Sequence, residues 1–160
     1  MNLSVYVDCN DQKAPKPEAF EAWVATALSG DHARWHPTEI AEVSIQVVDS
    51  EEMTRFNHQY RGKESDTNVL SFPVDAELQQ QTGLLGDLVI CSDVVQREAQ
   101  QQAKIPEHHW AHMTIHGTLH LLGYDHIADE DADLMEAIEI ERLAKLSIPN
   151  PYNQTENLTQ

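Results

Sequence analysis

The segment from Trp110 to Tyr124 constrains this sequence most, because it contains no Asp, Glu, Lys or Arg. Charged residues make up 23% of the chain, so an uncharged stretch of this length predicts a helix that is buried nearly all round. Pro106 is placed to begin that helix, and Gly123 is placed to end it in a left-handed conformation. The stretch nevertheless contains several histidines. Burying an imidazole ring costs free energy unless its nitrogens find hydrogen-bond or metal partners.

The spacing of these histidines predicts a metal site. His116 and His120 are four residues apart and share one face of a helix, as two ligands of one ion must. His112 continues the row, but by helix rise it begins roughly 12 Å from His120, too far to join the same ion. A turn at Gly123 can bring His126 back over that face, completing H-x3-H-x2-G-x2-H. Three imidazoles with an open fourth position predict one catalytic zinc ion per chain, whose bound water has a pKa near 7.

The remaining polar residues near this motif have more than one interpretation. His112 is expected to be a core histidine or to support a ligand without touching the metal. Asp125 is expected either to orient a histidine or accept a proton, or only to form the turn. The acidic run from Asp129 to Glu141 is interpreted as a solvated helix face rather than a docking surface. Five other histidines are predicted to lie at the surface: His32, His36, His58, His108 and His109.

Hydrophobic periodicity predicts an α+β fold in one domain over residues 1–160, with a frayed tail from about 149 to 160. A small mixed four-stranded sheet and about five helices are expected. The expected strands cover residues 3–7, 40–48, 67–72 and 86–91, the third at a sheet edge because Pro73 ends it. The expected helices cover 17–30, a segment entered at 49–50, 92–104, a segment beginning at 106, and 129–146. Residues 75–82 are expected to form an exposed loop.

Two details of these helices are expected from local rules. Met53, Phe56 and Tyr60 mark the inward face of the second helix. Ser92 is expected to cap the third helix.

Composition limits the functions that this chain can have. Its net charge of −17 repels polyanions, so the sequence does not predict a DNA- or RNA-coating protein. Arg55, Arg61 and Lys63 lie close together and are three of only ten cations, so a local positive site is expected on an acidic body. No apolar run is long enough for a membrane span, and the start MNLSVYVDCN lacks the features of a secretory signal. Cys9 and Cys91 are interpreted as reduced, inert thiols of a cytoplasmic protein.

The sequence from His116 to His126, HGTLHLLGYDH, resembles the signature of the YbeY family of bacterial metal-dependent endoribonucleases, also called rRNA maturation factors. The blocks YRGK (60–63), TNVLSFP (67–73) and GDLVIC (86–91) resemble that family's other motifs in the same order. The resemblance implies zinc on His116, His120 and His126, and a functional Arg61. It also implies cleavage of single-stranded RNA at the 3′ end of small-subunit ribosomal RNA, and a role in ribosome quality control. The implied partners are the ribosome, small-subunit ribosomal proteins and an assembly GTPase, with no DNA and no membrane.

Alternatives to a nuclease remain at this point. Metzincin proteases have a similar metal helix, but a Glu general base follows their first histidine, where this chain has Gly117. That glycine serves either close backbone packing or room for a bulky substrate. Arg61 and Lys63 are expected to bind phosphate, although each could be an ordinary surface cation. Besides a hydrolase of peptides or small substrates, a ribosome-assembly factor with a structural zinc is the other alternative.

Overall fold

The computed structural model describes residues 2–32, 35–36 and 39–153, and these form one four-stranded mixed sheet and six helices. The strands are β1 (Asn2–Asp8), β2 (Ile40–Val48), β3 (Val69–Pro73) and β4 (Leu84–Cys91). The helices are α1 (Pro17–Leu28), α2 (Ser50–Arg61), α3 (Ala76–Thr82), α4 (Ser92–Gln101), α5 (Pro106–Leu121) and α6 (Asp129–Lys145). The predicted α+β class is confirmed, with one helix more than expected.

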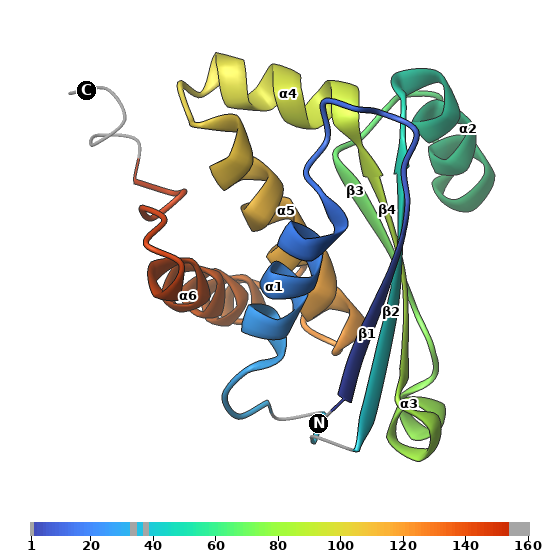
Figure 1. Cartoon of the computed structure of the whole chain (residues 1–160), viewed down its shortest axis with the longest axis vertical. Coiled ribbons are helices and arrows are strands. Elements are labelled where there is room, and N and C mark those ends of the chain that lie inside the picture. Colours follow the sequence, from blue (N-terminus) through green and yellow to red (C-terminus); the bar gives the residue numbers. More distant parts are fainter. Residues whose placement is uncertain (1, 33–34, 37–38, 154–160) are drawn as a thin grey trace.

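The sheet has the order β1-β2-β4-β3, in which β1, β2 and β4 are parallel and β3 runs antiparallel to β4 at the edge. Helices α1, α4 and α5 lie on one side of it, and α6 packs outside α5 (Figure 1). Helices α2 and α3 lie on the other side, near opposite ends of the sheet (Figure 1). The edge position predicted for the strand that ends at Pro73 is confirmed.

The core lies between the sheet and the layer formed by α1 and α5. In α1, which has Pro17 in its first turn, the predicted inward residues are all buried: Phe20, Trp23, Val24, Ala27 and Leu28. In α5, every side chain from His109 to Leu121 is buried except those of His116 and His120. The expectation of a helix buried nearly all round is therefore confirmed, and its two less buried positions are those of the predicted metal ligands.

Glycines let α5 lie close against the sheet. A Cβ at Gly117 would stand 3.0 Å from Leu88 Cδ2 and 3.1 Å from Val69 Cγ2. The carbonyl of Gly117 also accepts a hydrogen bond from Ser71 Oγ of β3, at 3.0 Å. Of the two roles expected for Gly117, the structure therefore supports close packing.

The prediction of a loop at 75–82 is wrong, because residues 76–82 form α3. Asp75 caps this helix by accepting a hydrogen bond from the Glu77 backbone N–H. Gln79 is buried, and its Nε2 donates to the carbonyls of Leu85 and Leu121. These bonds to β4 and α5 stabilise a short polar helix that has no apolar stripe of its own.

Two local expectations are also wrong. Ser92 does not cap α4, because its Oγ donates to the carbonyl of Val48 on the neighbouring strand. Tyr60 is 56% exposed, and the buried position near it belongs to Asn57, whose Nδ2 donates to the carbonyl of Ser65. Ser92 therefore makes a tertiary hydrogen bond in place of the expected cap, and Asn57 makes a hydrogen bond to a loop from the buried side of α2.

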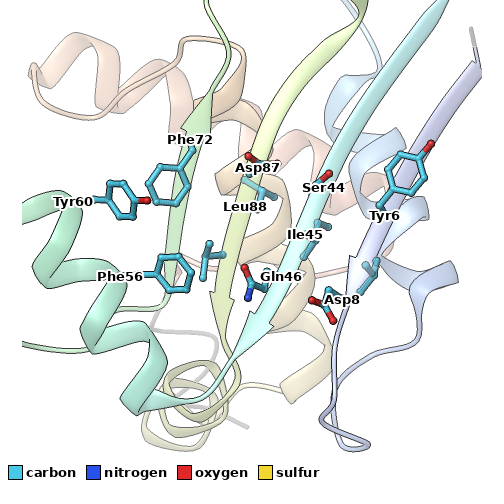
Figure 2. A pocket seen from close by; sticks show the side chains of 12 residues that line it. Tyr6, Asp8, Ser44, Ile45, Gln46, Phe56, Tyr60, Phe72, Asp87 and Leu88 are labelled. Atoms are coloured by element: carbon cyan, nitrogen blue, oxygen red, sulfur yellow. The ribbon is translucent and has the colours of Figure 1, made fainter.

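The face of the sheet away from α5 carries an open cavity of about 520 Å³. Figure 2 shows Phe56 and Tyr60 of α2 beside Phe72 of β3, with Tyr6 of β1 at the opposite edge. Tyr60 and Phe72 meet edge to face with ring centroids 4.9 Å apart. The residues that line this cavity include the carboxylates of Asp8 and Asp87 but no histidine.

The first residues of the C-terminal segment contact the end of the domain. Residues 149–153 follow α6, and the hydroxyl of Tyr152 donates a 2.6 Å hydrogen bond to Glu139. The rest of the expected tail, residues 154–160, lies outside the described residues. Within the described ranges, no helix combines the length and the apolar character that crossing a membrane requires.

Two glycine substitutions test how much the tight packing beside α5 contributes to stability. Gly86 has φ of 141°, and a Cβ there would meet the Phe72 carbonyl oxygen at 2.3 Å and Leu121 Cδ2 at 2.9 Å. We expect Gly86→Ala to lower the free energy of unfolding by about 3 kcal/mol or more. The control is Gly62→Ala, where φ is 70° but nothing lies within 4 Å, so only the left-handed backbone costs about 1 kcal/mol. Urea unfolding measures both, and equal losses would contradict the assigned contact.

Candidate metal centre

Helix α5 brings the first two histidines of the motif together. His116 and His120 lie one turn apart, and their ring centroids are 4.7 Å apart. Their Nε2 atoms are separated by 3.2 Å. The predicted pairing of these two rings on one helix face is therefore present.

The end of α5 returns the chain over the same face, as expected. Gly123 has φ of 99° and follows the C-cap residue Leu122. Its N–H donates to the carbonyl of His120, and the N–H of Tyr124 donates to that of Leu119, which is the Schellman pattern. The ring of His126 then lies 5.6 Å from that of His116 and 5.1 Å from that of His120, centroid to centroid.

The outer nitrogen of each helical histidine is held by an acceptor. His116 Nδ1 is 3.0 Å from Glu139 Oε2, and His120 Nδ1 is 2.8 Å from the carbonyl oxygen of Tyr124. A carboxylate and a carbonyl only accept, so both Nδ1 atoms donate. When such a ring is neutral, its Nε2 atom presents a lone pair.

A separation of 3.2 Å between the two Nε2 atoms requires a proton or a metal ion between them, because two facing lone pairs repel. Two nitrogens that bind one tetrahedral zinc ion at 2.0–2.1 Å lie about 3.3 Å apart. One ligand atom from each of His116, His120 and His126 falls within 4.8 Å of the others. This donor set can hold a metal ion, and the assignment of these three residues as its ligands stays a prediction.

The protonation state of His120 suits a ligand. Burial lowers the pKa of His120 to about 4, and the neighbouring ring of His116 contributes in the same direction. The imidazole is therefore neutral at pH 7, which is the form that binds metals.

Glu139 is the residue of this site that the sequence reasoning missed. Its side chain is 0% exposed although it belongs to the acidic run interpreted as solvated, so that interpretation is wrong at this position. Its oxygens accept hydrogen bonds from three side chains: His112 Nε2 at 2.5 Å, His116 Nδ1 at 3.0 Å and Tyr152 Oη at 2.6 Å. One signal was present in the sequence, because Met135, Glu139 and Leu143 recur at the helical spacing of a buried face.

These donors keep the buried carboxylate ionised. Burial by itself raises the pKa of Glu139, but the hydrogen bonds from His112 and His116 outweigh it and lower the pKa below its ordinary value. Glu139 therefore fixes the ring and the tautomer of His116, as carboxylates do behind metal-binding histidines. His112 hydrogen-bonds to the same carboxylate, and its supporting role stays a prediction.

Other predicted residues have mixed outcomes. Asp125 Oδ1 accepts a hydrogen bond from the Ile127 N–H, which fits the turn-forming alternative, and Asp125 also lines the cleft described below. His32 and His109 are buried, so their prediction as surface residues is wrong. His32 Nδ1 lies 2.9 Å from Tyr124 Oη, and His109 Nε2 lies 2.9 Å from Glu98, which explains why both rings can be buried.

The three histidines open into a cleft of about 640 Å³ between edge strand β3 and the turn after α5. Arg61, the last residue of α2, lines the same cleft, and Gly62 ends that helix with φ of 70°. Among the described lining residues, Asp125 is the only carboxylate. Lys63 is exposed and does not line the cleft, whereas Arg61 does, and the functional role of both cations stays a prediction.

The lowered pKa of His120 predicts how stability depends on pH in the metal-free protein. The unfolded chain takes up a proton at His120 below about pH 6.5, while the folded chain does so only near pH 4. We expect the free energy of unfolding in EDTA to fall as the pH is lowered from 6.5 to 4.5. Urea unfolding across this range should show a smaller fall for His120→Gln and an unchanged fall for the exposed His58→Gln. An identical fall in all three proteins would contradict the assignment.

Glu139 can be tested through metal affinity. We expect Glu139→Gln to weaken zinc binding by about 10- to 100-fold, because the neutral amide holds the His116 ring less firmly. Competition with a chromophoric chelator measures this change, and exposed Glu130→Gln is the matched control on the same helix. Unchanged affinity in a folded Glu139→Gln protein would show that the carboxylate does not support the ligand.

Comparisons with known proteins give matches that cover most of the chain. The family described as Endoribonuclease YbeY matches residues 6–147. A protein named Endoribonuclease YbeY from Colwellia psychrerythraea is 47% identical over 150 residues, covering 94% of this chain and 96% of the relative. One of the same name from Cellvibrio japonicus is 43% identical over 152 residues, covering 95% and 83%. A solution structure from Thermotoga maritima shares the fold, with a TM-score of 0.53, 22% identity and 91% coverage of each chain. Together these matches show that the chain belongs to the Endoribonuclease YbeY family.

Proposed function

We propose that this protein is a metal-dependent endoribonuclease that cleaves single-stranded RNA. The name of the family and of both relatives supports RNA as the substrate. The observation that carries the proposal is the convergence of three imidazoles in a cleft that Arg61 also lines. A metal centre beside a guanidinium is suited to phosphodiester chemistry, because both interact with phosphate oxygens.

In this proposal one zinc ion is held by His116, His120 and His126. Nitrogen ligands suit zinc, and three protein ligands leave a position for water or substrate. When bound, the ion would act as a Lewis acid on a phosphoryl oxygen and promote ionisation of a water or hydroxyl nucleophile. The 3.2 Å separation of two Nε2 atoms supports this assignment.

The chain's own residues bind the substrate and handle its charge. Arg61 donates to the phosphate oxygens and offsets the negative charge that develops during cleavage. Asp125, the one carboxylate among the described cleft residues, can take up a proton, since only its Oδ1 is engaged by the Ile127 N–H. Lys63 lies outside the cleft and is expected to contribute at most a peripheral contact with RNA.

The packing of Gly117 disfavours the peptidase alternative. A peptidase of the metzincin type needs a Glu at this position as general base. A Cβ at Gly117 already comes within 3.1 Å of Leu88 and Val69, so the position faces the sheet rather than the cleft. With glycine at this position, the chain has no carboxylate there to act as that general base.

The biological substrate we propose is ribosomal RNA, at the 3′ end of the small-subunit RNA, in the cytoplasm. A chain with a net charge of −17 and few cations near its cleft binds free RNA weakly. We therefore expect substrate selection to depend on the ribosome, its small-subunit proteins or an assembly GTPase.

A cleavage assay on a fluorescent single-stranded RNA tests the activity. We expect His116→Ala to abolish zinc binding and cleavage. We expect Arg61→Ala to retain zinc and lose about 10²- to 10³-fold in rate, because a donor to the developing charge is missing. His58→Ala, an exposed histidine outside the cleft, is the control. Cleavage that survives chelation or His116→Ala would contradict the proposal.

A further inference from the structure

A second cavity adjoins the cleft on the far side of His116. It measures about 520 Å³ and shares two of its lining residues, Asn68 and His116, with the cleft that contains Arg61. Its other walls come from the end of α4, the α4–α5 connection, α5 and the C-terminal segment. The two cavities therefore border each other at Asn68 and His116.

Lys104 places a cation in this cavity. Its backbone is fixed after α4, because Ala103 has a φ of 53° and the Lys104 N–H donates to the Ala99 carbonyl at 2.8 Å. Its side chain makes no hydrogen bond or ion pair with the part of the chain that the structure describes. Partial burial lowers the pKa of Lys104, although Glu98 nearby acts in the opposite direction. A partly desolvated ammonium without a hydrogen-bonded partner is suited to an external anion.

The other walls of the cavity are compatible with a nucleotide. Glu98 is the carboxylate that could repel a phosphate here, but its oxygens already accept hydrogen bonds from Asn68 Nδ2 and from His109 Nε2. Met113, Pro151 and Tyr152 provide apolar surface on which a base can pack. The cavity thus combines one available cation with apolar walls, beside the site of the proposed chemistry.

We propose that this cavity is a nucleotide subsite in which Lys104 binds the RNA phosphate next to the one at the histidine cluster. The inference rests on the proposed function, since it takes single-stranded RNA as the ligand. Arg61 and Lys104 then contact different phosphates on either side of Asn68 and His116. The direction of the RNA follows the line from one cavity to the other.

Binding of a fluorescent RNA hexanucleotide in EDTA tests the subsite without cleavage. We expect Lys104→Gln to raise the Kd about threefold to tenfold, and to reduce the slope of log K against log salt by about 0.7, the value for one phosphate contact on a single strand. Lys16→Gln, at the exposed start of α1, is the charge-matched control and should change neither quantity. Thermal unfolding establishes that both variants are folded. An unchanged Kd and slope in Lys104→Gln would overturn the proposal.

Neutral linkages locate the contact along the RNA. Six-nucleotide RNAs, each with a single methylphosphonate at a different position, are bound to wild type, Lys104→Gln and Arg61→Ala. We expect Lys104→Gln to bind one of these RNAs as tightly as the wild type does, because that RNA already lacks the charge that Lys104 contacts. We expect Arg61→Ala to match the wild type for a different RNA. If Lys104→Gln weakens binding equally for every linkage, or if Lys104 and Arg61 respond to the same linkage, the proposed arrangement of the RNA across the two cavities is wrong.

The outcomes separate this subsite from the proposed activity. If the zinc-loaded wild type cleaves RNA and Lys104→Gln binds RNA as the wild type does, the proposed nuclease activity is supported and the proposed subsite is wrong. If Lys104 is coupled to one linkage but the zinc-loaded wild type does not cleave RNA, the proposed subsite is supported and the proposed nuclease activity is wrong.

Discussion

The buried carboxylate of Glu139 is the interaction on which the histidine site depends. An ionised carboxylate in a protein core costs several kcal/mol unless donors surround it. Here His112, His116 and Tyr152 provide those donors from α5 and from the segment after α6. The same hydrogen bonds that make burial of Glu139 tolerable also orient His116, so the packing of α6 and the order of the site cannot be separated.

The close contact of α5 with the sheet decides where that site opens. Gly117 lets the helix approach β3 and β4, and Ser71 adds a hydrogen bond to its carbonyl. A glycine in mid-helix costs about 1 kcal/mol relative to alanine, so this packing is favoured at the expense of local helix propensity. Because β3 is a short strand at the sheet edge, the end of α5 carries its histidines to an accessible cleft rather than into the core.

Electrostatics in this protein differ between the whole molecule and the site. The chain as a whole is strongly acidic, yet one carboxylate and Arg61 line the described part of the cleft. Neutral imidazoles leave the charge of a bound cation uncompensated, so a metal ion would make the cleft a local positive focus. Lys104 adds a positive charge in the adjoining cavity. Long-range repulsion and short-range attraction therefore act in opposite directions on an approaching polyanion.

The elements that could be predicted from the sequence are those stabilised by local rules. The periodic apolar face of α1, the β2 strand at 40–48, and the uncharged α5 with its glycine turn are all present as expected. The meeting of His116, His120 and His126 also followed from the sequence, because helical repeat and a left-handed turn fix it within a few residues. The mixed sheet and the edge position of β3 followed from strand patterns and Pro73.

What only the tertiary structure decided involves polar residues buried by distant partners. Glu139 lies 27 residues from His112 and 23 from His116, and within an acidic run nothing but its helical spacing sets it apart. Tyr124 and Glu98 each pair with one ring nitrogen of the buried His32 and His109, and two carbonyls accept hydrogen bonds from the buried Gln79. A polar side chain is predicted at the surface by default, and only the assembled core supplies the donors and acceptors that allow its burial. The chain's local patterns therefore determined the histidine motif, whereas long-range packing determined the side chains that hold it in place.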